Sequence, residues 1–354
     1  MYIHDLSPFL WQISEGFGIQ WNGLAYMFSF LLSFLLIGWM AFRQRSELTP
    51  RMLGDFITAC AFGVLIGGRL GYCLFYSPDL FLKFRPDFPF WGVLALGEGG
   101  MSAHGGMLGL FLVGTLFAIR SGVSRLYLFD LMALAAPLGL LLGRIANFFS
   151  GEFIGKIAPI NFPYAMKFPS EILLWPEQPG NRLGDLASLA NQVSNISKTD
   201  WQTWLEKLST QSEAKKSVER VLIQIVQSIQ SGSVEVKNAL APLLSGRHAF
   251  QLYAALGEGL LLFLFLFILW YRPRKPGVIA ANFLVFYSAI RIFDEAYRWD
   301  VYSLIAGPFG LDRVQVLSLV VLFIGLISLF VWGRRETLPV RGWGRGHSVK
   351  LHRH

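Results

Sequence analysis

The sequence has few charged residues and almost no cysteine. Asp, Glu, Lys and Arg make up only 15% of the 354 residues, whereas hydrophobic residues make up 53%. Soluble domains carry about 25% charged residues, so this composition excludes an ordinary soluble domain and predicts a membrane protein with several spanning helices. The two cysteines, Cys60 and Cys73, lie in one apolar run and form neither a CxxC metal pattern nor a disulfide framework. We interpret them as buried thiols.

The first twenty residues contain no Lys or Arg. Because a secretory signal peptide begins with a positively charged region, we expect no cleavable signal here. The formal net charge of +8 does not indicate nucleic acid as a partner, since the basic residues of a membrane protein mainly determine its topology.

Seven apolar segments have the length of a helix that spans a bilayer, about 20 residues. They cover residues 22–42, 52–76, 101–119, 126–149, 250–271, 278–297 and 314–332. Short basic clusters occupy residues 43–51, 120–125 and 272–275 and the tail. The positive-inside rule assigns the side that gathers these clusters to the cytoplasm. The sequence therefore predicts an all-α polytopic membrane protein of about seven transmembrane helices, with the N-terminus outside and the C-terminus inside.

Composition divides the chain into four parts. Residues 1–149 hold a short N-terminal segment and transmembrane helices 1–4, and residues 249–333 hold transmembrane helices 5–7. Residues 150–248 between them form a loop and an extramembrane cap. Apolar residues recur at helical spacing in the cap, so we expect about three helices there. Residues 334–354 form a basic cytoplasmic tail.

The stretch from Gly143 to Gly155 closes the fourth apolar segment with charged and amide side chains. Arg144 and Asn147 are three residues apart, so they share one face of a helix, and Glu152 follows them. An ionised side chain at the centre of a spanning helix costs about 2.5–3.5 kcal/mol. Two interpretations are open: a functional site in the membrane, or a helix end at which Arg144 extends to the aqueous interface.

Other polar residues occupy comparable positions in their own segments. They are Arg69, His104 and the set Tyr287, Arg291 and Glu295, which repeats every four residues. The predicted topology places Arg69, His104, Arg144 and Arg291 at one depth, in the outer half of the bilayer. Three arginines lined by glycines suit an anion held by forked hydrogen bonds, most naturally the phosphate of a lipid. A histidine beside them can carry a proton near neutral pH.

Each of these residues also has a structural interpretation. A lone histidine such as His104 is more often a satisfied structural residue, and Arg69 can pair with Asp55 or with a backbone carbonyl. The stripe at 287, 291 and 295 can form a polar contact between helices. The residues alone leave these alternatives open.

Several motifs together resemble those of the bacterial phosphatidylglycerol–prolipoprotein diacylglyceryl transferases. The stretch 143–155 resembles the signature of this family, and residues 101–106 resemble its histidine-glycine-glycine motif. Residues 67–72, 161–166 and 287–295 also match in order and context. The resemblance covers all seven apolar segments and leaves out most of the cap.

The resemblance implies an enzyme that moves the diacylglyceryl group of phosphatidylglycerol to the lipobox cysteine thiol of a preprolipoprotein. Glycerol phosphate is released in this first step of lipoprotein maturation. The implied location is the bacterial inner membrane, with the active site toward the outer leaflet and the cap in the periplasm. The implied partners are phosphatidylglycerol, lipobox peptides and membrane lipids, with no metal and no cofactor.

The resemblance also implies roles for individual residues. Arg144 and Arg291 hold the lipid head group, and His104 is the base for the thiol or an essential orienting residue. Whether His104 or the phosphate of the substrate accepts the thiol proton is open. The implied substrate-binding residues are Arg69, Gly99, Gly100, Gly105, Arg144, Asn147, Glu152, Tyr287, Arg291 and Glu295.

The sequence departs from the family pattern in three places. Asn22 replaces a tyrosine, Ser150 replaces an asparagine, and residues 249–254 lack the proline, serine and glutamate of the family. A second hypothesis is therefore a catalytically impaired relative that binds lipid or lipoprotein. A transporter is a third hypothesis, which is disfavoured because no internal repeat is visible and the polar residues favour one face.

Overall fold

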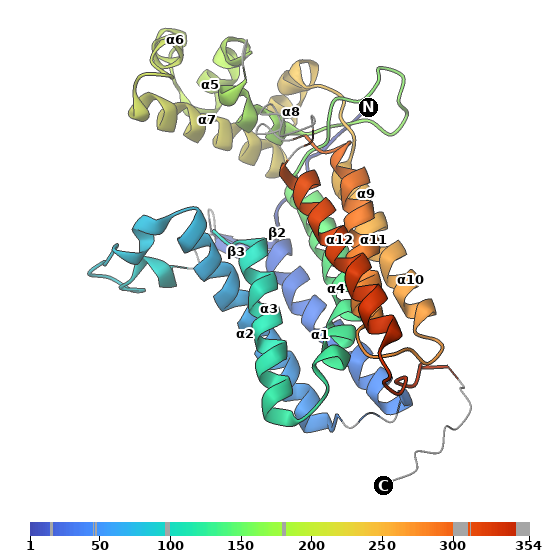
Figure 1. Cartoon of the computed structure of the whole chain (residues 1–354). Coiled ribbons are helices and arrows are strands. Elements are labelled where there is room, and N and C mark those ends of the chain that lie inside the picture. Colours follow the sequence, from blue (N-terminus) through green and yellow to red (C-terminus); the bar gives the residue numbers. More distant parts are fainter. Residues whose placement is uncertain are drawn as a thin grey trace. The chain divides into compact units, whose positions relative to one another are not determined.

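The computed structural model describes residues 1–14, 17–44, 46, 48–95, 100–178, 182–299, 311 and 313–344. Gly99 and the side chain of His104 lie outside what is described. Helices form most of the described chain (Figure 1). The long ones are α1 (Trp21–Gln44), α2 (Pro50–Phe75), α3 (Ala103–Ser121), α4 (Arg125–Ser150), α11 (Val278–Glu295) and α12 (Arg313–Arg334).

A further long helical segment consists of three consecutive parts. It contains α9 (Phe250–Ala254), the π-helical turn η7 (Ala255–Leu261) and α10 (Leu262–Leu269). Each of the seven predicted apolar segments corresponds to one of these helices or to the segment Phe250–Leu269. Each helix end lies within two residues of its predicted position.

Five of these helices are long and apolar enough to cross a membrane: α1, α2, α4, α12 and the segment Phe250–Leu269. The described part of the α3 segment, Gly105–Ser121, is apolar and shorter. The last turns of α11 carry Arg291, Asp294 and Glu295, which lower its hydropathy. The expected membrane character is thus borne out by five helices, while the total of seven spans and their orientation stay predictions.

Local sequence signals fix the ends of α2 and α3. Thr49 caps α2 by accepting a hydrogen bond from the Met52 N–H, and Pro50 occupies the first turn, where it leaves no donor unsatisfied. Ser102 caps α3 in the same way by accepting from the Gly105 N–H. Gly122 ends α3 in the left-handed conformation, with φ of 73°, which glycine adopts without a steric penalty.

Helices α2 and α3 pack against each other through glycines, which we call the glycine seam. Gly63, Gly67 and Gly71 repeat every four residues on α2, and Gly105 and Gly109 face them from α3. A Cβ atom added to Gly109 would lie 2.0 Å from the Gly63 carbonyl oxygen, and one added to Gly105 would lie 2.2 Å from that of Gly67. Small residues at this spacing let helix backbones approach closely in a membrane.

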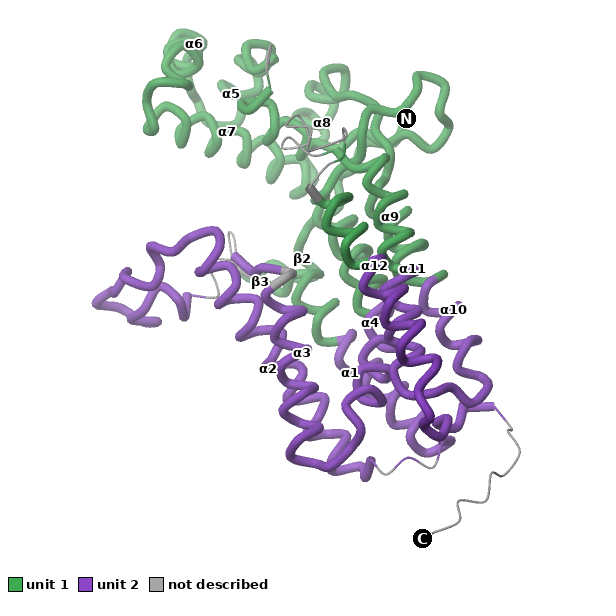
Figure 2. The backbone as a smooth tube through the Cα atoms, viewed as in Figure 1, with its two compact units in different colours: residues 1–27, 139–261, 287–321 green, residues 28–138, 262–286, 322–354 purple. Residues whose placement is uncertain are grey.

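The chain forms two compact units (Figure 2). The first comprises residues 1–27, 139–261 and 287–321, and the second comprises residues 28–138, 262–286 and 322–354. The second unit contains the glycine seam. The first unit contains the cap.

The cap has a hydrophobic core of its own. Its α-helices are α5 (Ala187–Ser194), α6 (Lys198–Glu206), α7 (Ser212–Gln230) and α8 (Val234–Leu240), with 3-10 turns η4 (Pro169–Glu177), η5 (Leu183–Leu186) and η6 (Ala241–Leu243). One face of α7 is buried, as its helical spacing predicts. Trp201 of α6 is fully buried and donates a hydrogen bond from Nε1 to the Leu183 carbonyl. The described cap therefore holds four α-helices instead of the three expected.

Short strands occur at the N-terminus, where the sequence predicts only a mixed segment. Strand β1 (Tyr2–Ile3) pairs in parallel with β4 (Met166–Lys167), and β2 (Phe9–Ser14) pairs antiparallel with β3 (Phe17–Gln20). The expectation of an all-α chain is therefore corrected to a mostly helical one. Between α2 and α3, the 3-10 turns η1 (Pro78–Phe81) and η2 (Gly92–Leu94) lie in the segment expected to be loop.

We expect Gly109→Ala to destabilise the protein because the added methyl group overlaps the Gly63 carbonyl. Overpacking of this kind costs about 1–3 kcal/mol. Gly54→Ala is the matched control, because no atom lies within 4 Å of a Cβ at Gly54 on α2. Thermal unfolding in detergent should show a midpoint below that of the wild type for Gly109→Ala. The midpoint of the control should be unchanged. Equal midpoints for the two variants would contradict the glycine seam.

Candidate functional site

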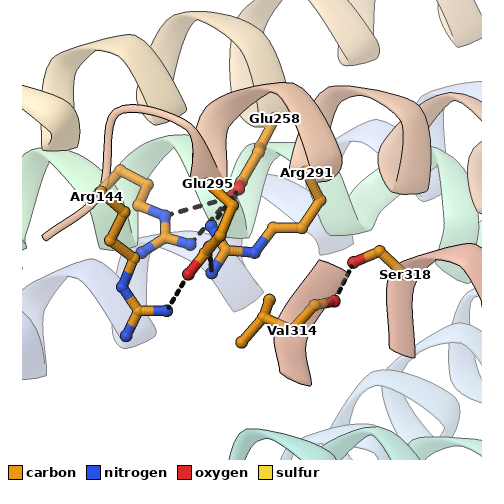
Figure 3. Close-up of polar contacts among 7 residues, drawn as sticks. Arg144, Glu258, Arg291, Glu295, Val314 and Ser318 are labelled. Atoms are coloured by element: carbon orange, nitrogen blue, oxygen red, sulfur yellow. Dashed lines mark hydrogen bonds and ion pairs between the residues drawn. The ribbon is translucent and has the colours of Figure 1, made fainter. Parts of the chain in front are cut away.

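Two arginines from different helices share one buried carboxylate (Figure 3). Arg144 of α4 donates from Nε and Nη2 to Oε2 of Glu258, at 3.1 and 2.9 Å. Arg291 of α11 donates from Nη1 to Oε1 of the same carboxylate, at 3.1 Å. The Glu258 side chain has no exposed surface, whereas those of Arg144 and Arg291 are 16% and 10% exposed. The carboxylate thus holds the two guanidinium groups together from their buried side.

Glu295 adds a second carboxylate on α11. Its Oε2 forms an ion pair with Nη2 of Arg291 at 2.9 Å, and its Oε1 accepts from Nη1 of Arg298 at 3.3 Å. We call Arg144, Glu258, Arg291 and Glu295 the arginine cluster. The carboxylates offset the positive charge of the arginines beside them, so both guanidinium groups can be held largely away from bulk water.

The arginine cluster keeps hydrogen-bond donors for a further anion. A guanidinium group has five N–H donors. The contacts of Arg144 use Nε and Nη2, which leaves Nη1 without an acceptor among the described residues. The contacts of Arg291 use Nη1 and Nη2, so its Nε also has no acceptor among the described residues. Two planar cations with unused donors and partial exposure fit an oxyanion such as phosphate.

The π-helical turn places Glu258 between α4 and α11. A Cβ at Gly259 would lie 2.7 Å from the Leu141 backbone on α4, so only glycine permits this approach. A Cβ at Gly257 would lie 3.0 Å from the Ile290 side chain on α11 and 3.6 Å from Oδ2 of Asp294. Glu258 therefore sits between two glycines, each of which brings η7 close to one of the arginine-bearing helices. Single π-helical turns within α-helices are frequent at functional sites.

Three other predicted residues belong to the same compact unit. The Tyr287 hydroxyl is close enough to Glu258 and Arg291 to interact electrostatically with both. Asn147 is half-buried, and its carbonyl accepts from the Glu152 N–H at 3.0 Å as the chain leaves α4. The exposed Glu152 side chain lies close enough to Asn22 to interact with it, at the position where the family pattern has a tyrosine. Among the described residues Glu152 forms no ion pair with Arg144 or Arg291, whose shared partner is Glu258.

The predicted residues of the second unit have a different environment. Arg69 is buried and donates to the carbonyls of Val93, Gly92, Ala95 and Gly100, at 2.8 to 3.0 Å. This is the backbone-carbonyl alternative for Arg69, and it fixes the segment that leads into α3. Gly105 lies in the glycine seam, and Gly100 has φ of 82° with Tyr72 packed against it. The predictions for Gly99 and for the His104 side chain fall outside the described residues.

A second buried ion pair supports the stretch that follows α4. Arg247 donates to Oε1 of Glu171 at 2.9 Å and to the Gly155 carbonyl at 3.1 Å, and its guanidinium lies 4.6 Å from the centre of a Trp299 ring. Gly155 packs so closely on His248 that a Cβ would lie 2.3 Å from its carbonyl oxygen. This pair anchors the end of the signature stretch, so Arg247 is structural here.

Two histidines outside the spanning segments contact the same region. His4 donates from Nε2 to the Phe148 carbonyl at 2.6 Å, and Gly151, with φ of 70°, packs against its ring. Nδ1 of His248 lies 3.2 Å from the Tyr253 hydroxyl oxygen. Burial lowers the pKa of both histidines, so both are neutral at pH 7.

The geometry decides between two of the sequence-based alternatives. Arg144 is not a helix-end residue that only extends into solvent, because two of its nitrogens bind the fully buried Glu258. The stripe at 287, 291 and 295 does make a polar contact between helices, since Arg291 joins α11 to η7. That contact and an anion site are compatible, because the contact leaves donors unused.

The sequence reasoning missed Glu258. It is the one carboxylate within the apolar run 250–271, and an ionisable residue inside such a run indicates function by default. The flanking glycines in Gly257-Glu258-Gly259 were a further signal.

A comparison with known families decides which family the chain belongs to. The family model for prolipoprotein diacylglyceryl transferases matches residues 8–332. The chain belongs to this family. A phosphatidylglycerol–prolipoprotein diacylglyceryl transferase of Bdellovibrio bacteriovorus is 46% identical over 351 residues, which cover 99% of each chain.

More distant relatives agree with this assignment. Proteins of the same name from Salmonella arizonae and Ralstonia pickettii are 31% and 32% identical, and the matches cover 94–96% of each sequence. Since these matches extend through the cap, the resemblance is wider than the motifs alone indicated. The diacylglyceryl transferase family accounts for the membrane character of the chain, and membership makes it a transferase of bacterial lipoprotein biosynthesis.

We expect Glu258→Ala to destabilise the protein, because it leaves two buried guanidinium groups without their shared partner. Breaking a buried ion pair on one side costs about 3–5 kcal/mol. Glu258→Gln should be intermediate, since the amide oxygen still accepts one hydrogen bond. Glu235→Ala, which removes an exposed carboxylate of α8, is the control. Thermal unfolding that ranks the Ala variant no lower than the control would contradict the bridging role.

Proposed function

We propose that this chain transfers the diacylglyceryl group of phosphatidylglycerol to the lipobox cysteine of a preprolipoprotein, as its relatives are named for doing. The observation that carries the proposal is the pair of arginines joined by Glu258, with donors left over for one phosphate. A phosphodiester in a membrane is the head group of a lipid. The arginine cluster would hold that group at the level of the spanning helices.

The proposed reaction is a displacement at carbon. The cysteine thiolate attacks the glycerol carbon that bears the phosphate ester, a C–S bond forms, and the C–O bond to phosphate breaks. Glycerol phosphate leaves with the bonding electrons, and Arg144 and Arg291 stabilise the charge that develops on it. The thiol must lose its proton to become a nucleophile. His104 and the departing phosphate are the two proposed acceptors for that proton.

The other predicted residues support this step indirectly. Glu258 and Glu295 orient the two arginines, so we propose them as positioning residues. Tyr287 lies beside Glu258 and Arg291 and is proposed to contact the head group. Asn147 and Glu152 shape the exit from α4. Arg69 is proposed to position the segment that precedes His104 through its bonds to Gly92 and Gly100.

We expect Arg144→Ala and Arg291→Ala to lose transfer activity. A guanidinium–phosphate contact that acts in the transition state is worth several kcal/mol, so rates should fall by about a hundredfold or more. The assay follows thioether-linked lipid on a lipobox peptide and the release of glycerol phosphate from labelled phosphatidylglycerol. Arg220→Ala on the exposed face of α7 is the control. Wild-type rates in both site variants would refute the phosphate assignment.

The same assay separates the proposed enzyme from a catalytically impaired relative. Asn22, Ser150 and residues 249–254 depart from the family pattern. Binding of phosphatidylglycerol with no turnover by the wild-type protein would favour the binding protein. Of these positions, Asn22 lies close enough to the Glu152 side chain to interact with it.

We propose that the chain lies in the bacterial inner membrane with the arginine cluster toward the outer leaflet. The basic clusters at 43–51, 120–125 and 272–275 support this orientation, because such clusters face the cytoplasm. The cap, whose surface carries both signs of charge, would then lie in the periplasm. Seven spans with the N-terminus outside fit this arrangement.

Cysteine labelling tests the orientation. Ser231→Cys in the cap should react with a membrane-impermeant maleimide in intact spheroplasts, whereas Ser124→Cys between α3 and α4 should react only after permeabilisation. Both serines are exposed, and the native Cys60 and Cys73 are buried, so the wild-type chain is the blank. The opposite labelling pattern would reverse the proposed topology.

A further inference from the structure

An open apolar groove lies within the second compact unit, which contains none of the residues of the arginine cluster. Its volume is about 440 Å³. Three helices line it with aliphatic and aromatic side chains: Leu32, Leu35, Leu36 and Trp39 of α1, Leu138 of α4, and Phe263 and Phe267 of α10. Its described lining residues include no charged residue. The volume is within the range of sites that hold small molecules, and the lining suits a hydrocarbon chain.

One end of the groove is built from aromatic rings and a cation. Trp39 stacks on Phe267 with ring centres 5.9 Å apart, and Trp343 from the C-terminal segment stacks on Phe267 at 4.5 Å. Trp343 is fixed there by a hydrogen bond from Nε1 to the Phe267 carbonyl at 2.7 Å. The exposed Arg43 guanidinium lies 5.4 Å from the centre of the Trp39 ring. Tryptophan beside arginine is typical of the head-group level of a membrane.

Outside α4, the described segments that form this end carry only positive charges; α4 carries Asp130, whose buried carboxylate accepts from the N–H groups of Gly277 and Ala280. Residues 21–44, 262–275 and 338–344 contain no Asp or Glu. They contain Arg43, Arg272, Arg274, Lys275 and Arg341. Arg274 donates a hydrogen bond to the Leu269 carbonyl, and Lys275 donates one to the Gly333 carbonyl. Arg43 and Arg272 are exposed. A ligand with an apolar chain and an anionic head would complement this arrangement.

The position of the groove along α1 identifies the leaflet. With a rise of about 1.5 Å per residue, Leu32 lies about 17 Å and Trp39 about 27 Å from the start of the helix at Trp21. The hydrocarbon core of a bilayer is about 30 Å thick. The groove therefore extends from the middle of the membrane to the side on which α1 ends, which is the cytoplasmic side in the proposed topology.

We infer that this groove binds one acyl chain of an anionic phospholipid of the inner leaflet, whose phosphate lies at Arg43. This inference rests on the proposed orientation and adds a lipid that is not the substrate. A substrate lipid of the outer leaflet reaches only to about the middle of the membrane, so its chains end where the groove begins. The bound chain would fill the space between α1 and α10.

Lipid retention by the full-length protein tests this inference. Wild type and variants are purified from vesicles of phosphatidylethanolamine and phosphatidylglycerol, and the phospholipids that stay bound are counted by native mass spectrometry. Leu36→Trp fills the groove, and Leu31→Trp, at an exposed position of α1 outside it, is the matched control. Arg43→Gln removes the cation, with Arg120→Gln at the exposed end of α3 as its control.

We expect Leu36→Trp to lose one tightly bound phospholipid that Leu31→Trp retains. Arg43→Gln should retain a lipid but lose the preference for phosphatidylglycerol over phosphatidylethanolamine. Diacylglyceryl transfer at saturating phosphatidylglycerol should be unchanged in both, which separates this site from the catalytic one. Equal lipid counts in Leu36→Trp and its control would overturn the inference. A raised KM for phosphatidylglycerol in Leu36→Trp would assign the groove to the substrate, and labelling that reverses the topology would overturn the leaflet.

Discussion

The contact on which the site depends is the buried carboxylate of Glu258 between Arg144 and Arg291. Two guanidinium groups repel each other, and in a spanning region water does little to screen them. Glu258 offsets this repulsion by accepting from both, through a different oxygen for each. The bridge also fixes the planes of the two arginines. In the proposed function, they are thus organised for an anion before a lipid arrives, so that little reorganisation would remain when it binds.

Glycine makes this bridge geometrically possible. Without hydrophobic attraction between helices in a lipid environment, close backbone approach supplies much of the packing energy. Gly257 and Gly259 bring η7 against α11 and α4, and the same device joins α2 to α3 through Gly67 and Gly105. A polar group held between such closely packed backbones has few alternative conformations, so the glycines contribute to the precision of the site as well as to stability.

The sequence predicted the helices well and the site in part. Helix ends were predictable because long apolar runs and local caps such as Thr49 and Ser102 define them. Arg144 and Arg291 were identifiable because a charge in an apolar helix is costly unless it has a use. Their partner was not, because pairing between α4, η7 and α11 depends on tertiary packing and on a π-helical turn that periodicity does not reveal. The interpretation of Arg69 depended similarly on carbonyls more than twenty residues away.

Two arginines joined by a carboxylate suit the proposed chemistry better than two isolated arginines, for a reason that lies in the charge of the substrate and of the leaving group. The phosphodiester of the substrate carries one negative charge, whereas glycerol phosphate approaches two as the C–O bond breaks, since the second pKa of a phosphate monoester is about 6. Glu258 and Glu295 already satisfy part of the arginines' attraction, so in the proposed reaction a singly charged substrate would be held moderately. The charge that develops in the transition state gains more from the same donors than the substrate does. That difference, rather than tight binding of the substrate, is what accelerates a reaction.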